Sequence, residues 1–186
     1  MSCLHDHHAS DRTSAVHSRR AIVTAIGAAA MLAATRPAAA ADASAEDERY
    51  MRMALDEARQ ADFPFGAVIV RDGQVIARGR NLGRTNDDPT AHGEMVAIRR
   101  CLADRGSAAL KGSALYTSGE PCVMCMGATV WCRFGRLVFA ASVEQIAARM
   151  NQIMISSADI AAKETFLPIK ITGGVLADEA VRLFGK

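Results

Sequence analysis

Four residues in the middle of the chain could together carry metal chemistry: His92, Glu94, Cys122 and Cys125. One imidazole and two thiolates form a three-ligand zinc set that leaves a fourth position for water, whereas a closed structural site has four protein ligands. The sequence has no second pair of cysteines at this spacing and no histidine after His92. The residue types therefore predict one open Zn²⁺ site per chain, with a catalytic water.

An open zinc site supports hydrolysis. Bound zinc lowers the pKa of water from about 15.7 towards about 7 in favourable sites, so hydroxide becomes available at neutral pH. Glu94 is then the natural proton carrier, because a carboxylate can take a proton from water and deliver it to a ring nitrogen and a departing amine. The predicted reaction is attack of hydroxide on an amine-bearing ring carbon, with release of ammonia. A non-catalytic zinc or thiol-binding module is the alternative from a different class.

Two helices must position these ligands. One is predicted within 87–103, with Asp88 as its cap and Pro89 in its first turn. The second is predicted from Pro121 to about Arg133. A metal beyond a helix N-terminus can be approached from several sides of the first turn, and the helix dipole there favours thiolates. The apolar stripe of the first helix is predicted to consist of Ala91, Met95, Ile98 and Leu102.

The remaining chain alternates strands and helices. The β-branched runs 67–71 and 74–79 flank Asp72-Gly73, a strong signal for a tight hairpin turn. Further strands are predicted at 113–118, 136–141 and 169–173, with helices at 44–61 and 176–184 and mainly helical or irregular structure over 144–163. A hairpin followed by alternating helices and strands predicts an α/β domain whose mixed sheet is sandwiched between helices.

Residues 1–41 have the features of a signal peptide. Arg19 and Arg20 precede an apolar run over 21–34, and small residues suited to cleavage follow near Ala40 or Ala41. The paired arginines indicate the twin-arginine route and a periplasmic or exported protein, with 42–186 as a single domain. A start at Met51 and a cytoplasmic protein form the alternative. No other segment is long and apolar enough to cross a bilayer, so no membrane partner is predicted for the mature form.

The charge balance argues against nucleic acid as a partner. Four of the 22 basic residues and two of the 20 acidic residues lie in 1–41, so the rest of the chain carries 18 of each. Nucleic-acid binders usually keep a basic surplus, because phosphate neutralisation supplies most of their non-specific affinity. The composition therefore favours a small-molecule substrate.

The combined motif resembles a known family. His92-Gly93-Glu94 followed by Pro121-Cys122-x-x-Cys125 is similar to the signature of the zinc nucleobase deaminases. With "FPFGAVIVRDGQVIARGRN" and "LYTSGEPCVMCMGATVW", it resembles the cytidine-deaminase-like superfamily, in the branch of bacterial guanine deaminases, transfer-RNA adenosine deaminases and fungal-type cytosine deaminases. The resemblance implies a three-layer α/β/α sandwich with a five-stranded mixed sheet, and a homodimer. Its implied substrate is a nucleobase or nucleoside, guanine first, with transfer-RNA adenosine or cytosine as alternatives.

The resemblance also implies roles for individual residues. His92, Cys122 and Cys125 would be zinc ligands, Glu94 the proton shuttle, Asn81 a hydrogen-bond partner of the base, Ala91 the donor of a backbone N–H near the pocket, and Phe65 and Trp131 aromatic side chains at the base. The chain departs from the family at Gly93, at Gly119 and throughout the tail after Ala141. In that tail Glu144 and Asp159 are candidates for a second, base-recognising acid, and solvated helix charges are the simpler interpretation of both.

Overall fold

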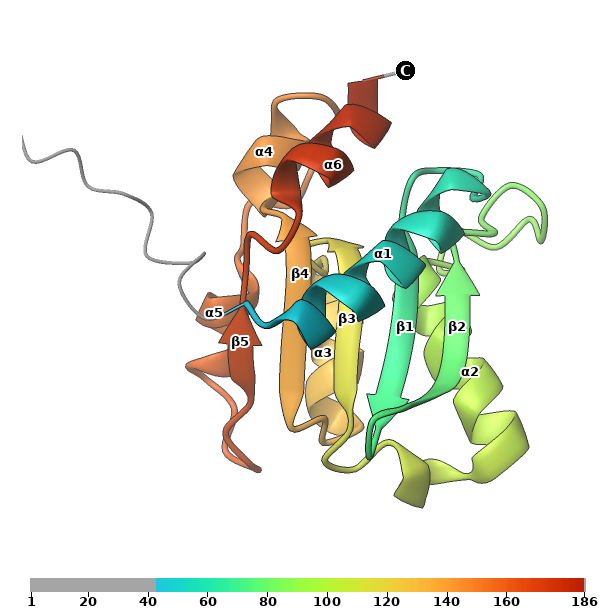
Figure 1. Cartoon of the computed structure of the whole chain (residues 1–186), viewed down its shortest axis with the longest axis vertical. Helices are drawn as coiled ribbons and strands as arrows, with labels where there is room; N and C mark the ends of the chain where they lie inside the picture. Colours follow the sequence, from blue (N-terminus) through green and yellow to red (C-terminus); the bar gives the residue numbers. More distant parts are fainter. Residues whose placement is uncertain (1–42, 186) are drawn as a thin grey trace, which may run out of the picture. The chain divides into compact units, whose positions relative to one another are not determined.

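The computed structural model of the chain describes residues 43–185 (Figure 1). The predicted signal peptide at 1–41 lies outside the described residues. Among the helices that are described, none is long and apolar enough to cross a membrane.

A five-stranded mixed sheet forms the middle layer of the domain. Its strands are β1 (Gly66–Arg71), β2 (Gln74–Arg80), β3 (Ala114–Gly119), β4 (Arg136–Ala141) and β5 (Lys170–Thr172), in the order β2-β1-β3-β4-β5. β1 is antiparallel to both β2 and β3, whereas β3, β4 and β5 run parallel to one another. The predicted hairpin and the predicted five-stranded mixed sheet are confirmed.

Helices cover both faces of this sheet. Their bounds are α1 Ala45–Arg59, α2 Gly93–Arg105, α3 Val123–Trp131, α4 Val143–Ala147, α5 Ser157–Ala161 and α6 Ala177–Val181. α1 and α6 pack on one face, while α2 and α3 pack on the other, where α5 contacts α3 (Figure 1). The predicted three-layer α/β/α architecture is therefore confirmed.

Alternation along the strands builds two separate cores. In β1, Val68 and Val70 face α1, and Ala67 and Ile69 face α2. Successive side chains of a strand point to opposite faces, so a strand covered on both faces reads as a continuous apolar run. This explains why β1 is buried from Gly66 to Val70.

Three segments that adjoin β1, β2 and β3 lie at the same edge of the sheet. Phe65 precedes β1, Asn81 follows β2, and Glu120 follows β3. Because β1 runs opposite to β2 and β3, the start of β1 and the ends of the other two strands meet at the same edge (Figure 1). The helices α2 and α3 also begin there.

The helix α2 begins later than predicted. The Asp88 carboxylate accepts hydrogen bonds from the Thr90 N–H at 2.8 Å and the Thr90 hydroxyl at 2.6 Å, which forms a local turn. Asp88 therefore does not cap the helix, and His92 occupies the N-cap position. Of the predicted apolar stripe, Ile98 is buried and Met95 is half-buried in α2, whereas Ala91 precedes the helix and Leu102 is 40% exposed.

Close backbone contact fixes where α2 starts. A Cβ atom at Gly79 of β2 would lie 2.2 Å from the Gly93 carbonyl oxygen and 2.4 Å from the Ala97 nitrogen. Only glycine lets the backbone of the helix rest on the backbone of the strand at this distance. The contact sets the position of the first turn of α2, and hence of His92.

Candidate active site

The three predicted metal ligands meet at one point. The Nδ1 atom of His92 lies 3.6 Å from the Sγ atom of Cys122 and 3.6 Å from that of Cys125, and the three donor atoms are all within 4.8 Å of one another. A tetrahedral zinc with Zn–S near 2.3 Å and Zn–N near 2.0 Å separates its nitrogen and sulfur ligands by about 3.6 Å. The donor types and their spacing fit zinc.

Both ligand segments are helix N-termini whose side chains are not used for capping. His92 is the N-cap of α2 and Cys122 is the N-cap of α3, both with extended backbone and neither with a side-chain capping hydrogen bond. Their side chains are therefore available beyond the helix ends. The unpaired N–H groups and the dipole of each helix favour negative charge in this space.

The two cysteines share one negative charge in the metal-free protein. Hydrogen bonds from Cys125 and His92 lower the pKa of Cys122 to about 4. The hydrogen bond that Cys125 gives to Cys122, together with burial, raises the pKa of Cys125. Zinc binding requires both thiolates, so uptake of the metal releases the proton held by Cys125.

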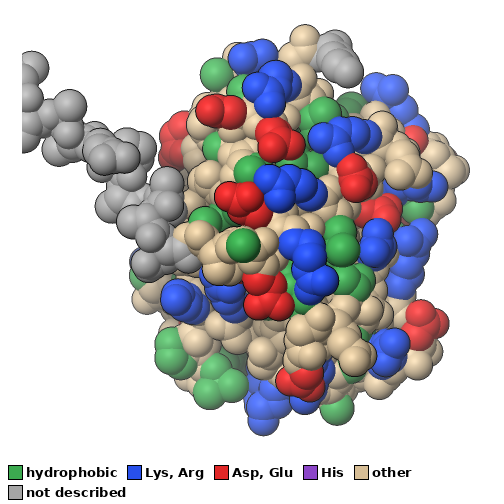
Figure 2. Space-filling view, in the orientation of Figure 1, with side chains coloured by type: hydrophobic (Ala, Val, Ile, Leu, Met, Phe, Trp, Pro, Cys, Tyr) green, Lys and Arg blue, Asp and Glu red, His purple; other side chains and the backbone are tan. Residues whose placement is uncertain are grey.

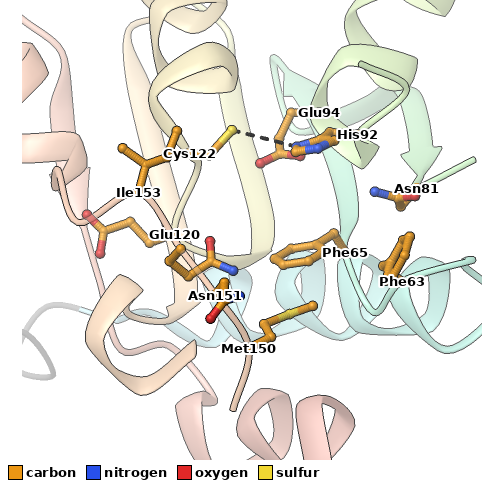
Figure 3. Close-up of a pocket in the computed structure, with 11 residues that line it drawn as sticks. Phe63, Phe65, Asn81, His92, Glu94, Glu120, Cys122, Met150, Asn151 and Ile153 are labelled. Atoms are coloured by element: carbon orange, nitrogen blue, oxygen red, sulfur yellow. Dashed lines mark hydrogen bonds between the residues drawn. The ribbon is translucent and has the colours of Figure 1, made fainter. Parts of the chain in front are cut away.

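Glu94 lies in the first turn of α2 and is buried, with 3% of its surface exposed. Burial raises the pKa of this carboxyl group to about 7. A carboxyl group with a pKa near the working pH can both accept and release a proton, as a general acid–base catalyst must. Figure 3 shows Glu94 beside His92, facing Cys122.

A cavity of about 450 Å³ opens over these residues. It is lined by Phe63, Phe65, Asn81, His92, Glu94, Glu120, Cys122 and the segment Met150–Ile153. The Phe65 ring lies parallel to the His92 ring, at 7° and with centroids 6.3 Å apart, and it packs edge-on against Phe184. Phe65 therefore forms a flat apolar wall suited to an aromatic ring (Figure 3).

Asn81 presents hydrogen-bond donors to the cavity. It is 3% exposed, and its Oδ1 atom accepts a hydrogen bond from the Gly83 N–H at 3.0 Å. This bond orients the amide with its nitrogen towards the cavity (Figure 3). The two amide N–H groups can donate to acceptors on a bound ring.

Two predicted pocket residues lie elsewhere. The Ala91 N–H donates to the Asp88 carbonyl oxygen at 3.0 Å, so it is not free to serve a substrate. Trp131 is 74% exposed and packs against Phe166, with ring centroids 4.9 Å apart. It lies six residues beyond Cys125, about 9 Å along the helix from the end where the ligands gather. Neither residue lines the cavity.

The two candidate acids of the tail also lie outside the cavity. Glu144 accepts a hydrogen bond from the Ser142 hydroxyl at 2.7 Å, and Asp159 completes the capping box of α5. Both side chains lie at helix ends, which agrees with their interpretation as solvated helix charges.

Three cavity elements were missed from the sequence. Phe63 could have been found as the first aromatic residue of the "FPF" sequence, and Glu120 as an acid directly before Pro121. The segment Met150–Ile153 is irregular and carries no periodic pattern, so only the folded structure brings it to the cavity.

The fold and the ligand set define a zinc-dependent deaminase. The sequence profile "Cytidine and deoxycytidylate deaminase zinc-binding region" matches residues 44–141, and the chain belongs to this family. The deaminases among its relatives are hydrolases that act on C–N bonds, and this chain spans about half to two thirds of the length of the first relatives that it matches.

Relatives with two different activities resemble the chain. A guanine deaminase of Bacillus subtilis is 51% identical over 78 residues, which span 42% of this chain and half the length of that enzyme. A tRNA-specific adenosine deaminase of Haemophilus influenzae is 38% identical over 138 residues, covering 72% of this chain and 78% of that enzyme. The solved guanine deaminase of Nitrosomonas europaea has a TM-score of 0.65 at 27% identity, covering 74% of this chain and 81% of that one. The family is therefore established, and its members differ in substrate.

The raised pKa of Glu94 predicts a pH-dependent stability of the metal-free protein. Between its ordinary pKa of 4.5 and about 7, the carboxyl group ionises in the unfolded chain and stays protonated in the fold. The unfolding free energy of the wild type should therefore fall by about 3 kcal/mol relative to Glu94→Gln over this range, and be level outside it. Urea unfolding after chelation, at a series of pH values, measures the difference.

Glu57→Gln controls for the loss of any carboxylate, because Glu57 makes no side-chain hydrogen bond among the described residues. Parallel stability curves for wild type and Glu94→Gln would contradict the assignment of a buried, protonated Glu94.

Proposed function

We propose that this chain is a hydrolytic deaminase of a free purine base or a related amino-heterocycle, with guanine as the first candidate. The observation that carries the proposal is the placement of Glu94. It lies buried beside a zinc-type ligand set, at a cavity walled by aromatic rings. A redox or purely structural role for the cysteines would require neither a proton carrier nor an open cavity.

The proposal assigns metal binding and substrate binding to different residues. His92, Cys122 and Cys125 would hold one zinc ion, which supplies Lewis acidity and lowers the pKa of water when it is bound. Phe65 supports the face of the ring, and Asn81 donates to a ring acceptor. These contacts align the amine-bearing carbon with Glu94, and orientation of this kind supplies part of the rate enhancement.

Glu94 carries the protons. Its carboxylate takes one proton from the attacking water while the water oxygen bonds to the ring carbon, and it gives this proton to the ring nitrogen. It then moves the remaining hydroxyl proton to the amine. The C–N bond breaks, the carbon–oxygen double bond forms and ammonia leaves. A zinc ion bound beside Glu94 would favour its ionised form, which is the form that accepts the first proton.

Deamination of adenosine in transfer RNA is the second candidate, and a specific observation favours it. A second hollow of about 540 Å³ shares Phe63, Asn81 and His92 with the cavity and is bordered by Arg84, which lies over the Phe63 ring at 4.5 Å. This hollow could take a sugar and a phosphate. Against it, Figure 2 shows basic and acidic side chains interspersed on one face of the domain. Arg52 of α1 also pairs with Glu48 at 2.9 Å, so its charge is partly neutralised. RNA therefore ranks behind a free base.

The functional unit is proposed to be a homodimer. The helix α3 has no charged residue, and its Trp131 is exposed beside a groove of about 530 Å³ that Ile155 and Phe166 also line. Exposed apolar patches of this kind mark interaction surfaces. A second copy of the chain is the occupant that the family resemblance implies.

Residues 1–41 are proposed to be a cleaved export signal of the twin-arginine type, as their three-part pattern indicates. That route carries folded proteins, so the metal site would form before the cysteines meet an oxidising compartment.

Ammonia release tests the proposed reaction. The purified mature protein should contain one zinc per chain and release ammonia from at least one of guanine, cytosine, adenine, isoguanine and pterin. Glu94→Ala should keep its zinc and lose at least about 10³-fold in kcat, because the proton carrier is gone. Release from transfer RNA alone, read as inosine, would favour the second candidate. Turnover on no substrate, with a sealed metal or a Cys122–Cys125 disulfide, would support the non-catalytic module.

Analytical ultracentrifugation tests the dimer. Trp131→Glu should sediment as a monomer at concentrations where the wild type is a dimer, because a buried charge opposes association. Leu102→Glu, an equally apolar exposed site on α2, should remain dimeric. A monomeric wild type would refute the proposal.

N-terminal sequencing of the native protein tests the leader. The expected mature terminus lies next to Ala40 or Ala41, in an exported fraction. A terminus at Met51 would show that residues 1–41 are not a signal peptide.

A further inference from the structure

The chain between α4 and α5 crosses the mouth of the cavity. We call residues 149–155 the strap; its residues Met150–Ile153 line the cavity together with Phe65 and Asn81. We propose that the strap selects the substrate, that Asn151 and Gln152 read the edge of the bound ring, and that Glu120 is the positioning residue that holds the strap. This inference rests on the proposed function.

Glu120 anchors the two helices that flank the strap. It is 8% exposed; its Oε2 atom accepts the Val143 N–H at 3.0 Å, and its Oε1 atom accepts the Ser157 N–H at 2.7 Å. These N–H groups belong to the first turns of α4 and α5, the helices that flank the strap. Hydrogen bonds to a buried carboxylate are stronger than neutral ones. One side chain therefore sets the distance between the two ends.

The same residue ties the strap to the metal site. Glu120 is followed by Pro121 and then by the ligand Cys122, which leaves no flexible linker between anchor and ligand. Pro121 also contributes its carbonyl oxygen, which accepts the Ser157 hydroxyl at 3.5 Å. A shift of the first turn of α4 or α5 relative to the zinc ligands would have to break these bonds.

The strap itself has almost no backbone support. Among the described residues, the backbone N–H groups of Asn151, Gln152 and Ile153 donate no hydrogen bond. Met150 N–H bonds to the Ile146 carbonyl oxygen at 3.0 Å at one end, and Ile155 N–H to that of Ile153 at 2.8 Å at the other. The position of the strap therefore depends on its anchors and on the walls of the cavity.

The four strap residues that line the cavity, Met150–Ile153, are uncharged. The cavity has two carboxyl groups: each oxygen of Glu120 accepts one backbone N–H, whereas Glu94 lies beside the metal-ligand set. The other polar cavity side chains with hydrogen-bonding amides are Asn81, Asn151 and Gln152. Figure 3 shows Asn151 and Ile153 across the cavity from Asn81.

This arrangement defines the class of substrate. The side chains of Asn151 and Gln152 make no hydrogen bond within the described part of the chain, so their donors and acceptors are available to a ligand. An amide offers a donor and an acceptor side by side, whereas a carboxylate only accepts. The geometry therefore favours an uncharged ring whose edge presents a hydrogen-bond donor next to an acceptor.

Substrate ratios test the reading of the ring. Asn151→Ala, Gln152→Ala and Asn151→Asp are compared with the wild type by kcat/KM for ammonia release from guanine, isoguanine, adenine and cytosine. Loss of one neutral hydrogen bond should change the ratio between two bases by about fivefold. Asn151→Asp should shift preference towards bases that present N–H groups. Gln74→Ala, an exposed amide on β2 outside the cavity, should leave every ratio unchanged.

Two outcomes are distinct. If the wild type releases ammonia but the variants change all four rates by one common factor, the strap proposal is overturned and the proposed function stands. If the wild type acts on none of the bases, both are overturned.

Glu120 is tested as a positioning residue. Glu120→Ala should raise KM about tenfold or more with zinc content unchanged, and should increase amide hydrogen exchange at 143–157. Glu120→Gln keeps one accepting oxygen and should restore part of the effect. Unchanged KM and unchanged exchange in both variants would overturn this role. Should Glu120→Ala fail to fold, Glu120→Gln and the strap variants decide the question.

Discussion

The 3.6 Å separation between His92 and the two cysteines is the constraint on which the site depends. Its three atoms come from two helices that are distant in the sequence, so the distance is kept only if both helices start at the same edge of the sheet. The Gly79 contact with α2 meets this requirement on one side, and the short turn from β3 into α3 meets it on the other. The same arrangement brings two helix dipoles to one point, which favours the thiolates that zinc needs.

Burial then separates the roles of the acidic groups. Glu94 and Glu120 both line the cavity, yet their partners differ. Glu120 accepts two backbone N–H groups and is a structural anchor, whereas desolvation raises the pKa of Glu94 and keeps a proton within reach of the reaction. The proposed roles of the two carboxyl groups, positioning for Glu120 and proton transfer for Glu94, follow from these different surroundings.

The proposed determinant of substrate choice lies in the part of the chain with the least regular structure. The matched family profile ends at Ala141, and the tail that follows supplies the strap and its flanking helices. Relatives act on guanine or on transfer-RNA adenosine. Loops on a rigid scaffold vary more than the elements that they connect, so a loop over the cavity is a suitable place for a difference in substrate.

The sequence by itself determined the metal chemistry and the fold class. His92, Glu94, Cys122 and Cys125 are recognisable because ligand types at helix starts are a local property, and the strands are recognisable because apolar alternation and the Asp72-Gly73 turn are local too. Only the tertiary structure decided the start of α2, the exposure of Trp131 and the arrival of Asn151 and Gln152 at the cavity. The start of α2 depends on which neighbouring group the Asp88 carboxylate bonds. The exposure of Trp131 depends on the direction in which its side chain leaves the helix. The position of Asn151 depends on Glu120, an anchor 31 residues away along the chain. Residue pattern alone specifies none of the three.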